Sequence, residues 1–176
     1  MKKNVLVFGL ISGLILTALM ITSTVMCYRK ENFEGNMVLG YAAMLLAFAF
    51  IFVGVKNYRD KFNNGLISFG KAFKIGLYIS LIASSMYVLV WLVEYYVFIP
   101  DFMDKYIPHV MKAAREGGAT AAELEKKATQ MAEFKEMYKN PVFVVLISYL
   151  EVLPIGIAVS LICAWILRRK PKMVAG

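Results

Sequence analysis

Four long apolar stretches constrain the fold of this 176-residue chain more than any other feature of its sequence. They cover approximately residues 5–27, 37–55, 75–99 and 142–167, and none of them contains Lys or Arg. About 20 residues of apolar α-helix are needed to cross the hydrocarbon core of a bilayer. Backbone polar groups in lipid must be hydrogen-bonded within their own segment, so each stretch is predicted to be an α-helix. The predicted fold class is all-α, an integral membrane four-helix bundle in which residues 1–176 form a single membrane domain.

The overall composition supports a membrane protein. Hydrophobic residues make up 60% of the chain and charged residues 18%, whereas a soluble domain averages about half apolar and about a quarter charged. The formal net charge is +8, which in a soluble protein would suggest binding to nucleic acid. Here the basic residues flank the apolar stretches, the placement expected for contact with anionic lipid headgroups. We therefore expect a lipid bilayer and not nucleic acid as the partner of these charges.

The distribution of Lys and Arg predicts the orientation. One side of the membrane carries the N-terminus, the loop at 56–74 and the tail at 168–172, with 11 basic residues and one acidic residue. The opposite side carries nine basic and nine acidic residues. Because cytoplasmic loops carry an excess of Lys and Arg, both termini are predicted to be cytoplasmic, and the basic loop and tail to contact anionic headgroups. The first apolar stretch is too long for a typical signal peptide and no small-residue cleavage site follows it, so we interpret it as a retained span.

The segment at about 100–140 is predicted to form an extracytoplasmic helical hairpin between the third and fourth spans. Gly117 and Gly118 interrupt the helical pattern, and Thr120 and Glu123 have the spacing of a capping box that begins a second helix. The apolar stripes of both helices are thin, so the hairpin would be marginal alone in water. We expect it to rest on the bundle or on a partner.

A repeated motif indicates how the spans pack. IGLYISLI at 75–82 recurs as IGIAVSLI at 155–162, and small residues four apart share one helix face in three of the spans. Close backbone approach across small residues drives helix association in lipid, because apolar side chains gain little from leaving lipid. Packing is therefore the favoured explanation, and duplication of a two-helix unit is the alternative. The predicted helix-packing residues are Gly9, Gly13, Gly76, Ser80, Ser84, Gly156, Ser160 and Ala164.

Glu94 and Glu151 are the two charged residues inside the predicted spans. A charged side chain at the bilayer centre costs about 3 kcal/mol on insertion scales, so both are candidates for an intramembrane polar site. Both are predicted to lie in the outer half of the membrane, at depths that would allow a common pocket. Pro154 removes a helical hydrogen bond close to Glu151, and the freed carbonyl and the carboxylate could together hold a proton or a small cation. The alternative is that each carboxyl group only hydrogen-bonds a neighbouring helix or chain.

The sequence predicts no cofactor, metal or disulfide. His109 is the single histidine and has no second ligand at helical spacing. Cys27 and Cys163 are predicted to lie near opposite membrane surfaces, too far apart for a disulfide. Residues 66–74, which include Lys71 and Lys74, are predicted either to lie in the headgroup layer or to extend the third span as a helix.

Most of the chain, roughly residues 5–170, resembles the domain of unknown function 4199 family. The most specific pieces are the G-x-x-x-Y-R-D motif at 54–60, ISFGKAFKIG at 67–76 and the E-x-L-P-I-G motif at 151–156. The resemblance implies a four-helix integral protein of the bacterial cytoplasmic (inner) membrane, without an assigned activity. It supplies no catalytic or binding residues.

The predicted function is a non-enzymatic scaffold or interaction protein, either as a homo-oligomer or with another membrane protein. The alternative is a small oligomeric transporter or proton- or cation-coupled unit that uses Glu151 next to Pro154. An enzyme is not expected, because the sequence has no paired acid and base, nucleophile elbow, metal cluster or phosphate-binding loop.

Overall fold

The computed structural model describes residues 1–30, 33 and 37–169, and these residues are α-helical throughout most of their length. A π-helical turn, η1 (Glu94–Phe98), directly continues the third α-helix. No strand occurs among the described residues, which confirms the predicted all-α class. The α-helices are α1 (Lys2–Lys30), α2 (Met37–Phe62), α3 (Phe69–Val93), α4 (Phe102–Glu116), α5 (Ala121–Met137) and α6 (Pro141–Leu167).

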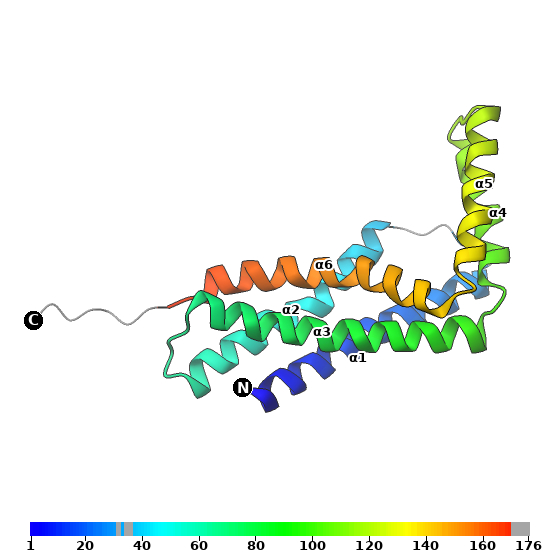
Figure 1. Ribbon diagram of the computed structural model, residues 1–176. Helices are drawn as coiled ribbons and strands as arrows, with labels where there is room; N and C mark the ends of the chain where they lie inside the picture. Colours follow the sequence, from blue (N-terminus) through cyan, green and yellow to red (C-terminus); the bar gives the residue numbers. More distant parts are fainter. Residues whose placement is uncertain (31–32, 34–36, 170–176) are drawn as a thin grey trace, which may run out of the picture.

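Four of these helical segments are long and apolar enough to cross a membrane: α1, α2, α3 with η1, and α6. They lie side by side, and α3 contacts each of the other three (Figure 1). The start of α1, the turn between α2 and α3, and the end of α6 gather at one end of the molecule. We call this the inner end, and the opposite end the outer end.

The helices at the inner end are longer than predicted. α2 continues to Phe62, whereas the sequence predicted an end near residue 55, and α3 begins at Phe69 rather than near residue 75. A helix need not stop at the edge of the hydrocarbon, because lysine and arginine side chains can reach the headgroups from helical positions. Of the two interpretations of residues 66–74, helix extension therefore applies from Phe69 onward, with the Ser68 hydroxyl accepting a hydrogen bond from the Lys71 N–H at 3.4 Å.

The interior between the four long helices is filled by apolar side chains. Phe48, Ile51 and Ile79, which come from α2 and α3, have 0% exposure. Among the described residues, the polar side chains with the same 0% exposure are the small hydroxyls of Ser12, Ser80, Ser84 and Ser160. The centre of the molecule is therefore mainly apolar and closely packed.

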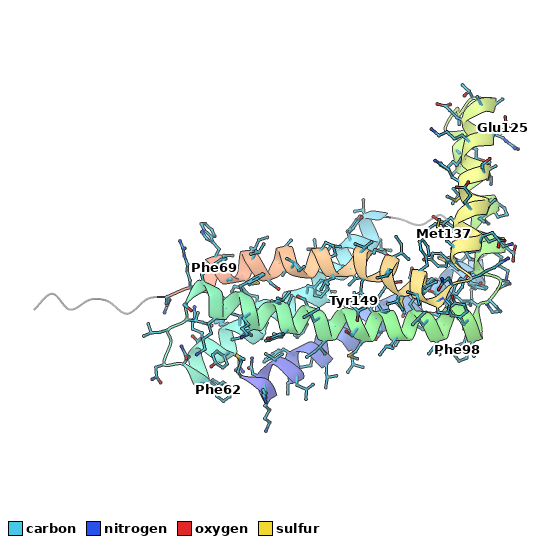
Figure 2. The ribbon with its side chains drawn as sticks, viewed as in Figure 1. Phe62, Phe69, Phe98, Glu125, Met137 and Tyr149 are labelled. Atoms are coloured by element: carbon cyan, nitrogen blue, oxygen red, sulfur yellow. The ribbon has the colours of Figure 1, made fainter. Side chains whose placement is uncertain are left out.

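The α4–α5 pair projects sideways from the outer end, across the direction of the long helices (Figure 1). Its tip lies near Glu125 and its base near Met137 (Figure 2). Gly118 has φ +83° in the turn, and the capping box of Thr120 and Glu123 is present, so both predictions for this turn are confirmed. Met103 is the buried residue of α4, and α5 has none, so most of the pair is not covered by the rest of the described chain.

The base of the α4–α5 pair sits on an aromatic cluster. The ring of Phe102 lies 5.5 Å from that of Trp91, and the ring of Tyr138 lies 5.3 Å from that of Tyr95. These contacts join the start of α4 and the end of α5 to the outer end of α3 and η1.

Candidate functional site: a pocket between α1 and α3

The repeated motif forms a reciprocal contact between α3 and α6. A Cβ atom added to Gly76 would lie 2.9 Å from the Cβ of Ser160, and one added to Gly156 would lie 2.8 Å from the Cβ of Ser80. The two serine Oγ atoms are 3.1 Å apart at the centre of the contact. Each copy of the motif therefore places its glycine against the serine of the other, and the helices approach closely because both glycines lack a side chain.

The small residues of α1 pack in the same manner. A Cβ on Gly9 would lie 2.8 Å from the Cβ of Ile82, and Gly13 faces the side chain of Met86. Ser12 donates a hydrogen bond to the Ala47 carbonyl of α2 at 2.7 Å. All eight residues predicted to pack the helices are buried: Gly9, Gly13, Gly76, Ser80, Ser84, Gly156, Ser160 and Ala164.

A second set of polar contacts near the inner end was not predicted from the sequence. The side-chain amide of Asn4 donates to the Gly54 carbonyl at 2.9 Å, and the amide of Asn57 donates to the Asn4 Oδ1 at 2.7 Å. Arg59 is 8% exposed and contacts both the Asp60 carboxylate at 2.6 Å and the Leu167 carbonyl at the end of α6. The G-x-x-x-Y-R-D motif contains Gly54, Arg59 and Asp60, and it was a usable signal for these contacts.

Glu94 is buried near the outer end, with 8% exposure. Its Oε2 atom has no hydrogen-bond partner among the described residues. Glu94 also begins the π-helical turn, in which its carbonyl accepts a hydrogen bond from the Ile99 N–H at 2.9 Å. Such π turns are rare and often mark functional sites, because they shift the side chains that follow relative to a regular helix.

Glu94 lines a pocket of about 610 Å³ between α1 and α3 with η1. The walls are mainly apolar side chains, among them Ile21, Val25, Val90 and Val93, and Arg29 stands at the end of α1. Ligand sites typically have volumes of about 300–1,000 Å³ and apolar walls with a few polar groups, and this pocket has the same character.

The pocket opens on the side of the helices that faces away from the core. Val25 and Val93 are 43% and 52% exposed, although both line it. Phe98, which lines its outer part, is 74% exposed and marks the outer end of α3 with η1 in Figure 2. A ligand could therefore enter from the side, between the helices.

The outer end of α1 is attached to the start of α4 next to this pocket. The Tyr28 hydroxyl donates to the Asp101 Oδ1 at 2.9 Å, and the Lys105 ammonium lies 2.8 Å from the Asp101 Oδ2 and 4.3 Å from the Tyr28 ring centroid. Hydrogen bonds from Lys105 and then Tyr28 hold the pKa of Asp101 below its usual value. Tyr28 also lines the pocket, so the pocket and the base of the α4–α5 pair share a residue.

Glu151 and Pro154 lie elsewhere. Both are exposed on α6, and neither lines the pocket that contains Glu94. The structure thus keeps Glu151 next to Pro154 on an outward surface and does not join them to Glu94 in this pocket.

The described residues contain no group of three or more His, Cys, Asp or Glu side chains that could hold a metal ion. The His109 ring lies 5.3 Å from the Phe33 ring, and its Nδ1 lies 3.0 Å from the Lys105 carbonyl oxygen. Cys27 and Cys163 are both free thiols.

Comparison with known proteins identifies one family. A family model described as protein of unknown function (DUF4199) matches residues 7–169. No curated protein and no solved structure matches the chain.

Proposed function

Since the chain belongs to the DUF4199 family of proteins of unknown function, we propose a function from its geometry: a non-enzymatic interaction protein of a bacterial inner membrane. In this proposal α1, α2, α3 with η1, and α6 span the bilayer as a four-helix bundle. The excess of Lys and Arg at the inner end supports a cytoplasmic location for both termini. The α4–α5 pair then lies on the extracytoplasmic side and contacts a partner.

The observation that carries the proposal is the uncovered α4–α5 pair. α4 has one buried residue and α5 has none. The two helices therefore gain little stability from packing against the rest of the described chain. Their charges are mixed and include ion pairs such as Lys135 with Asp104, so this surface belongs outside the hydrocarbon, where a partner can reach it.

Site-specific photocross-linking in cells tests this function. A photoreactive amino acid at Ala132, which is exposed on α5, is expected to give a discrete protein adduct. The same group at Leu146, which is 58% exposed on α6, serves as the control and is expected to give lipid adducts. Absence of any protein adduct from Ala132 and from neighbouring exposed positions of α5 would contradict the proposal.

The second candidate function is an oligomeric transporter or proton-coupled unit around Glu151 and Pro154. The exposure of Glu151 on α6 favours it, because an ionisable group facing lipid is costly and a second copy of the chain could cover it. Proton and cation flux into liposomes, measured for the wild type and for Glu151→Gln, separates the two functions. Flux that this substitution abolishes supports the transporter, and absence of flux in both supports the interaction protein.

A further inference from the structure

The pocket between α1 and α3 has the properties of a lipid site. Its apolar walls open sideways toward the membrane, so a ligand that partitions into lipid reaches it without passing through water. Its volume of about 610 Å³ lies within the range for one small-molecule or single-chain ligand. The occupant is therefore expected to carry an apolar chain.

Two polar groups define the rest of the ligand. Glu94 supplies a carboxyl group to the lining, and its Oε2, which lacks a hydrogen-bond partner among the described residues, lies beneath the pocket surface and has to turn toward the pocket to meet a ligand. A buried unpaired oxygen of this kind costs free energy, which a ligand hydroxyl that donates to it would recover. Arg29 is exposed one residue before the end of α1, at the level expected for headgroups, where its guanidinium can bind a phosphate.

These three features fit one class of molecule, and we propose that the pocket binds a single-chain lipid phosphate with a free hydroxyl beside the phosphate. The chain lies against Val90 and Val93, the hydroxyl donates to Glu94, and the phosphate contacts Arg29. A two-chain phospholipid has esters where this ligand has its hydroxyl, so it cannot donate to Glu94 from that position. The binding leaflet is extracytoplasmic if the proposed topology holds, whereas the binding chemistry does not depend on the topology or on the partner of the α4–α5 pair.

Binding is measured by native mass spectrometry of the delipidated full chain in a non-ionic detergent, with palmitoyl lysophosphatidic acid as the probe. The wild type is expected to bind one molecule saturably. Hexadecyl phosphate, which lacks the hydroxyl, and monopalmitoylglycerol, which lacks the phosphate, are each expected to bind about tenfold more weakly. Equal affinity for all three, or equal affinity for diacyl phosphatidic acid, would overturn the proposal.

Substitutions assign each part of the ligand to its residue. Glu94→Leu is expected to weaken lysophosphatidic acid about tenfold and to leave hexadecyl phosphate unchanged, because only the first ligand has the hydroxyl. Arg29→Gln is expected to weaken both phosphates about tenfold and to leave monopalmitoylglycerol unchanged. Lys30→Gln removes a neighbouring charge outside the pocket and is expected to change none of the three.

A matched pair of tryptophan substitutions tests the location. Val93→Trp fills the pocket from a position that is 52% exposed and is expected to abolish binding. Leu89→Trp adds the same side chain one turn away, at a position that is 63% exposed and does not line the pocket, and is expected to bind as the wild type does. Both side chains are more than half exposed, so folding should persist in both variants. Wild-type binding by Val93→Trp, or wild-type selectivity in both Glu94→Leu and Arg29→Gln, would refute the site.

Discussion

Glu94 combines three properties that a residue selected only for packing does not need. It is buried, one of its oxygens is unpaired among the described residues, and it begins a π-helical turn. Glu151, in contrast, is exposed and lies within α6, away from the π-helical turn. The sequence identified both carboxyl groups as unusual, because each interrupts an apolar stretch. It favoured Glu151 as the functional carboxyl group, because Pro154 lies close to it, whereas Glu94 is the one that lines the pocket. Neighbouring residues do not fix which face of a transmembrane helix meets another helix.

The unpaired Glu94 oxygen predicts an unusual mutational effect. Glu94→Leu is expected to raise the stability of the ligand-free protein by about 1–3 kcal/mol, because it removes the buried oxygen Oε2, which has no partner among the described residues. Thermal unfolding in detergent, followed by a thiol-reactive dye or by circular dichroism, measures the change. Glu94→Gln keeps a polar group at the site and is the control, with little change expected. A lower melting temperature for Glu94→Leu would mean that Glu94 has a stabilising partner.

At the scale of single elements, the sequence predicted some helix ends and missed others. The start of α6 near residue 142 and the turn at Gly117 and Gly118 were predicted, because proline and glycine have strong local preferences. The inner ends of α2 and α3 were not, because hydropathy locates the hydrocarbon and not the end of a helix that continues beyond it. The sequence also could not predict which helices contact each other. Small-residue stripes predict close contacts, but they do not say that the stripe of α3 meets that of α6.

The contact between α3 and α6 gives a prediction with an internal control. Gly76→Ala and Gly156→Ala are each expected to destabilise the protein by about 1–3 kcal/mol, because the added Cβ would lie within 3.0 Å of a serine on the other helix. Gly40→Ala and Gly70→Ala have no atom within 4 Å of the added Cβ and are expected to change stability little. Thermal unfolding of the four variants in one detergent provides the comparison. Equal melting temperatures across the set would show that close glycine packing does not hold α3 and α6 together.

The junction between α1 and α4 is expected to depend on pH. Because contacts with Lys105 and Tyr28 lower the pKa of folded Asp101, its contribution to stability is present at neutral pH. The contribution is lost as the pH falls through the folded pKa, below the ordinary aspartate value of about 4. The protection factors of the amides at residues 25–30, which are corrected for the intrinsic pH dependence of exchange, should therefore fall in acid in the wild type. Asp101→Asn should exchange faster already at neutral pH and respond less to acid, and an identical pH response in both proteins would contradict this role.

The orientation of the whole molecule is a prediction from charge, which the arrangement of the helices supports by gathering the basic segments at one end. With Cys27 and Cys163 replaced by alanine, a membrane-impermeant thiol reagent added to intact spheroplasts should label Gly118→Cys and not Asn64→Cys. Both positions are in turns between helices, so labelling of each reports the side of the membrane on which its turn lies. Labelling after lysis controls for reactivity, and the reverse pattern would put the α4–α5 pair in the cytoplasm.

The sideways direction of the α4–α5 pair restricts what can stand beside this protein. If the long helices cross the bilayer, the pair runs along the membrane surface and not away from it. The 17 residues of α5 then reach about 25 Å over the adjoining lipid. A neighbour on that flank has to fit beneath this overhang, which admits compact transmembrane proteins and excludes those with a bulky extracellular domain.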